Sequence, residues 1–261
     1  MNITCLDIET TGLDKSVDRI VQLSLQNFDS KTFELGENRN WYILPSGGWC
    51  MNPEAMKIHG ITPEFLIENG TSLKDIYPEW CELTRDHAIL SYNGPKFDIP
   101  MIQKDFETDG LDTGFDKCRF IDVLDIERKL NKQENNKLNE AYERYFGHPF
   151  EGAHDASADI LATIEIYKKQ MESVKGKPNR SRIVAESILR STNDMAISPD
   201  GFVYRDDSGY LKFRWGKHKN MPVIEVCQKD PKYIRWLWDK NVVCGITRNT
   251  IRMEFYRYKK T

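Results

Sequence analysis

The sequence lacks any long hydrophobic run. No window approaches the roughly 18 consecutive apolar residues that a membrane-spanning helix needs, so we expect no membrane partner. The amino terminus leads directly into a strand-like segment and shows no signal-peptide pattern. These absences predict a soluble, intracellular protein of the cytoplasm.

The sequence also lacks closely spaced cysteine pairs, internal repeats and low-complexity tracts. No C-x-x-C pair occurs, and the cysteines are spread over the whole chain, which argues against a zinc site and against a disulfide framework. The chain of 261 residues is long enough for one domain of about 150 to 200 residues and a smaller one. The six cysteines stand at positions 5, 50, 81, 118, 227 and 244.

The small net charge of -3 conceals an uneven distribution. Residues 176–261 carry 18 Lys and Arg against 9 Asp and Glu, whereas residues 1–175 carry 19 against 31. Gly176 and Pro178, which both disfavour helix, stand where the balance changes sign. We therefore predict two domains, 1–175 and 176–261, and the basic second domain suits a polyanion such as nucleic acid.

Hydrophobic patterning in the first domain indicates an α/β layer fold. The segment RIVQLSLQNF alternates apolar and polar residues, and NWYILP follows after a polar turn, so the first three strands are predicted to form an antiparallel meander. Farther along, the strand-like segments HAILSYN and CRFID alternate with helical patterns, as in layered α/β proteins.

Four acids stand on a strand, just after a strand or in the first turns of a helix in this pattern. Asp7 and Glu9 lie one residue apart on a strand and project from the same face, which is costly unless a cation is bound. Asp98 follows a later strand, and Asp159 lies one turn into a helix that His154 precedes. Carboxylate oxygens are what Mg²⁺ prefers; the alternative is a set of solvated surface acids.

The motifs DIETTGL, NGPKFD and HDASAD, with the segment MNPEAMKIHGIT, resemble the DnaQ-like 3′–5′ exonucleases of the DEDD type with a catalytic histidine. The resemblance covers about residues 1–173 and implies an RNase H-like exonuclease fold, a mixed five-stranded sheet flanked by helices. It implies that Asp7, Glu9, Asp98 and Asp159 bind two Mg²⁺ (or Mn²⁺) ions. His154 would be the general base, because an imidazole with a pKa of about 6.5 can take a proton from water.

The resemblance also implies a pocket for the 3′-terminal nucleotide. This sequence departs from the family pattern at Tyr92, where the family often has a histidine. The difference affects how the 3′-terminal nucleotide is held. His59 is either structural or near the substrate, and Phe97 either stacks on a base or belongs to the core. The implied substrate contacts are Thr10, Thr11, Gly12, Leu13, Asn93 and Phe97.

The segment Phe213–Lys240 is similar to the carboxy-terminal module of exonuclease X, which implies a small α+β unit. Asn220 replaces a usual glycine and tolerates the same left-handed geometry. Asp230 and Pro231 are predicted to start a helix, with Tyr233, Trp236 and Leu237 on its packed face. Phosphate contacts are expected from Lys217, His218, Lys219 and Arg235.

These patterns predict a metal-dependent exonuclease that degrades DNA from 3′ ends and releases nucleoside 5′-monophosphates. Residues around the metals do not declare whether a 2′-OH is accepted, so an RNA-trimming exonuclease is the first alternative, and the module favours DNA. The second alternative is a non-catalytic nucleic-acid-binding protein, against which the complete set of acids speaks. The sequence indicates no particular protein partner.

Overall fold

The computed structural model describes residues 2–115, 117–131, 135–152, 155–178, 181, 184, 187–189, 198, 202–206, 208–240, 242–243 and 245–258. Two compact units divide the chain, Met1–Ile188 and Leu189–Thr261. The division comes later than the predicted boundary at 175/176, because Val184 packs in the first core and Lys129 donates a hydrogen bond to Ser187 Oγ (3.0 Å). No described helix is long and apolar enough to cross a membrane.

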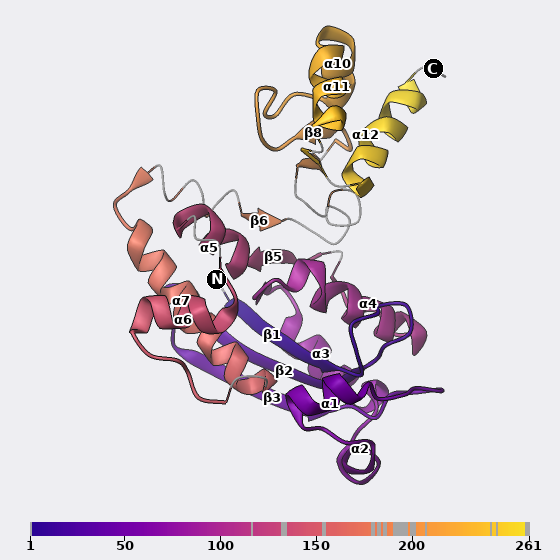
Figure 1. Cartoon of the computed structure of the whole chain (residues 1–261), viewed down its shortest axis with the longest axis vertical. Coiled ribbons are helices and arrows are strands. Elements are labelled where there is room, and N and C mark those ends of the chain that lie inside the picture. The colour runs from indigo at the N-terminus through magenta and orange to yellow at the C-terminus, as the bar shows by residue number, and fades with distance from the viewer. Residues whose placement is uncertain are drawn as a thin grey trace. The chain divides into compact units, whose positions relative to one another are not determined.

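The first unit is built on a mixed sheet with the strand order β3-β2-β1-β4-β5-β6 (Figure 1). The first three strands form the predicted antiparallel meander, and β4 and β5 run parallel to β1. The predicted mixed five-stranded sheet is confirmed, with a two-residue strand added at its edge. The strands are β1 (Asn2–Thr10), β2 (Ile20–Asp29), β3 (Leu35–Tyr42), β4 (Ala88–Ser91), β5 (Arg119–Asp122) and β6 (Ile188–Leu189).

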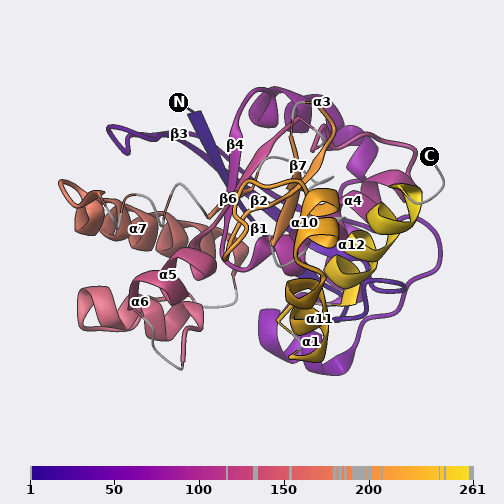
Figure 2. The same ribbon diagram turned by 90° about the horizontal axis from the view of Figure 1, so that it is seen from above.

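Helices cover both faces of this sheet. Figure 2 shows α5, α6 and α7 on one side and α3 and α4 on the other. Polar side chains start several of them: Asn52, Thr62, Ser72 and Asp155 each accept a hydrogen bond from an N–H of the first turn. The elements are α1 (Pro53–His59), α2 (Pro63–Asn69), α3 (Leu73–Thr84), the 3-10 turn η1 (Gly94–Lys96), α4 (Asp98–Thr108), α5 (Val123–Asn131), α6 (Leu138–Phe146) and α7 (Ala156–Val174).

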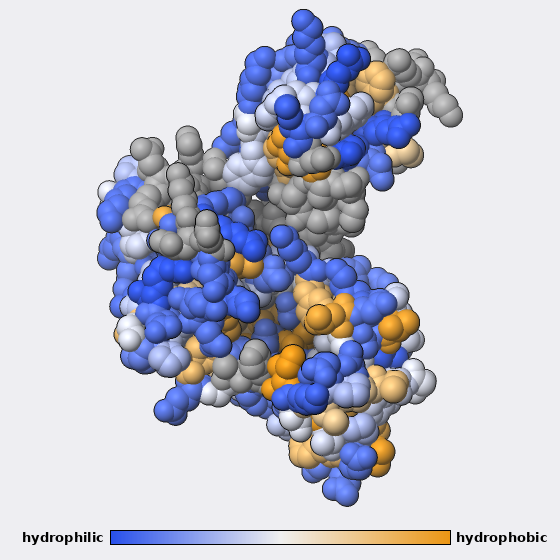
Figure 3. Space-filling view, viewed as in Figure 1, coloured by the Kyte–Doolittle hydropathy of each residue, from blue (hydrophilic) through white to orange (hydrophobic). Residues whose placement is uncertain are grey.

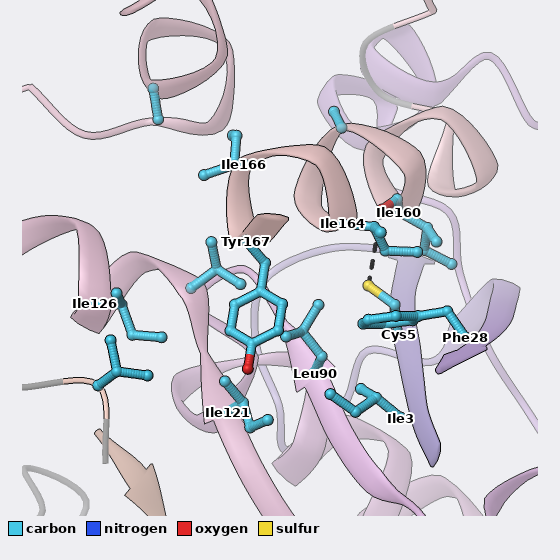
Figure 4. Packing of buried hydrophobic residues seen from close by; sticks show 14 of the residues in the cluster. Ile3, Cys5, Phe28, Leu90, Ile121, Ile126, Ile160, Ile164, Ile166 and Tyr167 are labelled. Atoms are coloured by element: carbon cyan, nitrogen blue, oxygen red, sulfur yellow. Dashed lines mark hydrogen bonds between the residues drawn. The ribbon is translucent and has the colours of Figure 1, made fainter. Parts of the chain in front are cut away.

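The longest helix, α7, packs across β1 and β2. Figure 4 shows Cys5 of β1 pointing at α7, where its thiol donates to the carbonyl oxygen of Ile160 at 3.8 Å. Side chains alternate along a strand, so Ile3 and Cys5 share their face of β1 with Asp7 and Glu9. The same face therefore passes from an apolar core beneath α7 to a pair of acids.

The second unit has its own core. Strands β7 (Val203–Arg205) and β8 (Leu211–Phe213) pair antiparallel, and the helices are α10 (Val223–Lys229), α11 (Pro231–Asp239) and α12 (Gly245–Tyr258). The buried residues that form the core are Val203, Leu211, Phe213, Val223, Val226, Cys227, Ile234, Leu237, Val243 and Ile251.

Two local predictions for this unit are confirmed and one is wrong. Asn220 has a φ of 64°, the left-handed value predicted at this position. Asp230 is the N-cap of α11 and accepts a hydrogen bond from the N–H of Tyr233 (3.2 Å). The packed-face prediction fails for Trp236, whose side chain is 47% exposed although Leu237 beside it is fully buried.

Candidate active site

Three of the predicted metal ligands converge at one point. One carboxylate oxygen from each of Asp7, Glu9 and Asp159 lies within 4.8 Å of the other two. Asp7 is opposite Ser24 in the β1–β2 pair, and Ser24 Oγ lies 3.4 Å from Ser157 Oγ in the first turn of α7. This contact places the start of α7, and with it Asp159, over the strand face that carries the other two acids.

Asp98 reaches the site from a different direction. It is the first residue of α4 and is buried, and a hydrogen bond from the backbone N–H of Ile8 favours its charged form. It is not a member of the three-acid group, but its charge raises the pKa values of Asp7 and Glu9. The turn before it requires glycine, because a Cβ on Gly94 would lie 2.0 Å from Ser91 Oγ.

Burial and mutual repulsion make these acids hard to ionise. Burial, then Asp98, Asp159 and Glu9, raise the pKa of Asp7 well above its usual range. The same effects, with burial largest, raise the pKa of Glu9 to about 8, and burial raises that of Asp98 to about 7. Hard divalent cations bind such an oxygen-rich set and offset its repulsion, so the donor set fits Mg²⁺ or Mn²⁺.

The loop after β1 is fixed by hydrogen bonds of its own. Thr10 Oγ1 donates to the carbonyl of Gly12 (2.6 Å), and Thr11 Oγ1 donates to Asp18 (2.7 Å). A Cβ on Gly12 would lie 2.5 Å from the carboxylate of Asp18, so a larger residue there would displace that carboxylate. The loop ends at Leu13, whose side chain is 81% exposed and available for apolar contact.

His59 holds this loop from behind. Its Nδ1 accepts a hydrogen bond from the backbone N–H of Ile61 (3.0 Å), and its Nε2 lies 3.2 Å from the carbonyl oxygen of Thr10. A ring that accepts at Nδ1 donates at Nε2, which is the neutral form, and burial lowers the pKa of His59. The carbonyl of Thr11 accepts from the N–H of Asn52 (2.8 Å). The contacts give His59 a structural role.

The segment after β4 places the other predicted substrate residues. Asn93 adopts a left-handed φ of 66°, and its N–H donates to Asp122 Oδ1 (2.9 Å). Phe97 is half-buried and immediately precedes α4. Tyr92, which departs from the family pattern, donates its hydroxyl proton to the carbonyl of Asn136 (2.6 Å).

Two acids at the site were missed by the sequence analysis. Asp122 ends β5, is buried, and orients the turn at Asn93; burial raises its pKa to about 6. Asp155 caps α7 by accepting from the N–H of Ser157 (2.9 Å), and its charge adds to the repulsion on Asp7. An Asp directly before a helix is a detectable N-cap signal, whereas nothing local singles out Asp122. The predicted base His154 lies outside the described residues.

Exposed hydrophobic surface is visible near this loop. On the face drawn in Figure 3, orange surface of the first unit gathers over α1 and α2 among mainly hydrophilic residues. Ile58, Phe65 and Ile67 are the large exposed hydrophobic residues of these two helices. Exposed apolar residues beside a polar site are typical of surfaces that contact a ligand.

A family model described as an exonuclease, RNase T, matches residues 4–167. The chain belongs to the RNase T family of exonucleases. All residues of the three-acid group and Asp98 fall inside the matched range. The predicted DnaQ-like exonuclease domain is thereby confirmed, while the particular likeness to exonuclease X stays a prediction.

Relatives include DNA polymerase III subunit epsilon of Buchnera aphidicola subsp. Schizaphis graminum, 30% identical over 55% of this chain and 62% of that protein. Exodeoxyribonuclease I of the same bacterium is 26% identical over 64% of this chain and 39% of its own length. The chain thus spans less than two thirds of these relatives. Among solved structures, E. coli exonuclease I in complex with a dT13 oligonucleotide aligns with a TM-score of 0.58 and 26% identity, over 69% of this chain and 42% of that one.

Proposed function

We propose that this protein is a divalent-metal-dependent 3′–5′ exonuclease that hydrolyses phosphodiester bonds of DNA and releases nucleoside 5′-monophosphates. The convergence of Asp7, Glu9 and Asp159 within 4.8 Å carries the proposal. Solvated surface acids would separate, whereas these are partly buried on packed elements, and the pKa values of Asp7 and Glu9 are raised. Membership of an exonuclease family supports the reaction class.

The metal ligands proposed are Asp7, Glu9, Asp98 and Asp159, which would hold two Mg²⁺ or Mn²⁺ ions. When bound, such a pair stabilises the attacking and leaving oxygens of an in-line displacement at phosphorus. The chain supplies the remaining tasks. His154 accepts the proton of the attacking water, because a neutral imidazole is basic enough at neutral pH.

The terminal nucleotide is assigned to the loop after β1 and the turn after β4. The exposed side chain of Leu13 makes apolar contact with a base, and the backbone of Thr10–Gly12 lies beside the acids on β1. Asn93 and Phe97 contribute from the turn that Asp122 fixes. His59 keeps the loop in place through the carbonyl of Thr10.

DNA is favoured over RNA as the substrate. E. coli exonuclease I is described in complex with a dT13 and with a dA16 oligonucleotide, and a curated relative is an exodeoxyribonuclease. None of the contacts at the acids distinguishes a 2′-OH, so RNA is the alternative that the experiment decides.

Cleavage of 5′-labelled single- and double-stranded DNA and RNA, with Mg²⁺ or with chelator, tests the proposal. We expect a ladder shortening from the 3′ end, mononucleotide release, and no product in chelator. Asp7→Ala should abolish cleavage while the far-UV circular dichroism spectrum stays that of the parent. Full turnover in chelator or in Asp7→Ala would refute the metal site, and preferential cleavage of RNA would change the substrate.

A further inference from the structure

Helix α11 of the second unit presents the ring of Trp236 to solvent. Trp236 is 47% exposed, and the ring of Tyr233, one turn earlier, stacks on it with centroids 5.6 Å apart and planes 28° apart. The other side of the helix is occupied by Ile234 and Leu237, which are buried in the core. The exposed ring of Trp236 is therefore not needed to anchor α11, whereas the half-buried Tyr233 also packs against the core.

Positive charge brackets these rings along the helix. Lys232 and Lys240 stand four residues before and after Trp236, a spacing that brings side chains to the same face. A rise of 1.5 Å per residue separates the two lysines by about 12 Å along the axis. Both are exposed, and within the described part of the chain neither forms a side-chain hydrogen bond or ion pair. Asp239 is the only acid of α11.

Three of the basic residues that the sequence predicted to contact phosphate make other contacts in the structure. Lys217 and His218 both contact the carboxylate of Asp230, at 2.7 and 3.0 Å, so they support the N-cap of α11. Arg235 lines a cavity of about 190 Å³ with Ile234, Trp238 and residues of α10 and α12, on a different face from Trp236. The lysines on the face of Trp236 are thus the ones placed beside the exposed ring.

We propose that this face of α11 binds single-stranded nucleic acid. A base stacks on Trp236, which Tyr233 supports from behind, and Lys232 and Lys240 contact phosphates on either side. Stacking is indifferent to sequence, because every base has a π-face. Paired bases in a duplex offer no free face, so the site prefers single strands. The choice of a nucleic acid as occupant rests on the proposed function, since an acidic protein segment also matches exposed aromatic and basic residues.

Salt dependence separates stacking from charge. Binding of a fluorescent single-stranded oligonucleotide to the full chain is measured in chelator, where no cleavage is expected, over a series of salt concentrations. The variants are Trp236→Ala, Trp236→Phe, and the double variant Lys232→Gln with Lys240→Gln. Arg235→Gln is the matched control, because it removes one positive charge from another face of the same helix.

Trp236→Ala should weaken binding roughly 5- to 150-fold with the salt slope unchanged, since stacking contributes about 1–3 kcal/mol per base. Trp236→Phe should recover much of this loss. The double lysine variant should reduce the slope by about 1.4, because each phosphate contact on a single strand contributes about 0.7. Arg235→Gln should leave affinity and slope near those of the parent.

Parent-like affinity of Trp236→Ala at every salt concentration would overturn the proposal. Equal affinity of the parent for single strands and duplex would also overturn it. So would a Trp236→Ala variant that loses affinity for an acidic peptide such as poly-glutamate but keeps the parent's affinity for the oligonucleotide. The outcome is independent of catalysis: Trp236→Ala should keep the parent's turnover at saturating DNA with Mg²⁺. If the parent cleaves no nucleic acid, the nuclease proposal fails, while the binding series still decides the role of α11.

Discussion

Asp122 fixes the backbone of Asn93 across the sheet: the N–H of Asn93 lies 2.9 Å from Asp122 Oδ1. The same oxygen accepts from the N–H of Leu124 at 3.0 Å. The end of β5 therefore sets the left-handed turn after β4, which leads through η1 to Asp98. The acid takes no direct part in the proposed metal site, yet it determines where one ligand begins its helix.

Two replacements of Asp122 should show whether its hydrogen-bond acceptor or its negative charge matters. Asp122→Ala leaves two N–H groups without this acceptor, at a cost of about 1–3 kcal/mol in the free energy of unfolding, and should raise KM for DNA. Asp122→Asn keeps an oxygen for both donors and removes a carboxyl whose pKa burial raises to about 6, so it should be milder in both respects. Urea unfolding and steady-state kinetics make the comparison; equal losses in the two variants would show that the charge itself matters.

Without metal, the protein should become less stable as pH rises. The pKa values of Glu9 and Asp98 are raised to about 8 and about 7 in the folded chain, against about 4 when unfolded. The folded state then holds these protons more tightly, so the stabilisation is complete below about pH 4 and is lost as pH rises through 7 to 8. The melting temperature in chelator should fall over this range, and Mg²⁺ should restore it.

Glu9→Gln is the control for this pH dependence. The variant removes one of the titrating groups, so its melting temperature in chelator should vary less between about pH 5 and pH 8.5. Mg²⁺ should also stabilise it less than it stabilises the parent, because one ligand is missing. A parent melting temperature that is flat with pH in chelator would contradict the electrostatic account of the site.

His154→Ala should lower turnover by about 10²- to 10⁴-fold, the range expected for loss of a general base, with a smaller change in KM. The rate of the parent should fall as pH drops through about 6.5. His148→Ala is the matched control, because this exposed histidine has no proposed role. Its ring packs edge-on against that of Tyr142, with the ring centroids 5.9 Å apart. A His154→Ala enzyme with the parent's turnover and pH profile would remove His154 from the mechanism.

The sequence predicted those features that depend on local patterns. A short apolar run identified β1, alternation identified β2, and helical spacing identified α3 and α7. The acid pair on β1 follows from the two-residue period of a strand. The strand β3 begins at Leu35, earlier than predicted, because its first six residues, LGENRN, are mostly polar and largely exposed. An edge strand that is held by backbone bonds and by polar side chains such as Asn38 and Asn40 gives no hydrophobic signal.

Features that depend on distant neighbours escaped prediction. The role of His59 requires the loop at Thr10 to lie beside it, and that of Asp122 requires β4 and β5 to be neighbours. Helical spacing placed Trp236 and Leu237 on one face of α11 but did not predict how deeply each is buried, since exposure depends on the elements packed around the helix. The first unit extends past the predicted linker because Val184 reaches its core.

The buried ion pair between Arg19 and Asp105 should control the loop that precedes it. Arg19 Nε lies 2.8 Å from Asp105 Oδ1, and Asp105 Oδ2 accepts from the N–H of Ile20 (2.8 Å). The backbone of Arg19 in turn pairs with Thr11, whose N–H donates to its carbonyl (2.8 Å). This pair therefore connects α4 to the proposed nucleotide-binding loop.

Asp105→Ala should cost about 3–5 kcal/mol in the free energy of unfolding, because it leaves the charge of Arg19 buried without its partner. It should also raise KM for DNA more than it lowers turnover, since the loop moves while the acids on β1 stay in place. Arg19→Met combined with Asp105→Leu should be less destabilising, because no charge is left buried. Urea unfolding with steady-state kinetics tests both effects. If the double variant is less stable than Asp105→Ala, the packing of Arg19 and its hydrogen bond to the carbonyl of Ser46 (2.7 Å) matter more at this position than the compensation of charge.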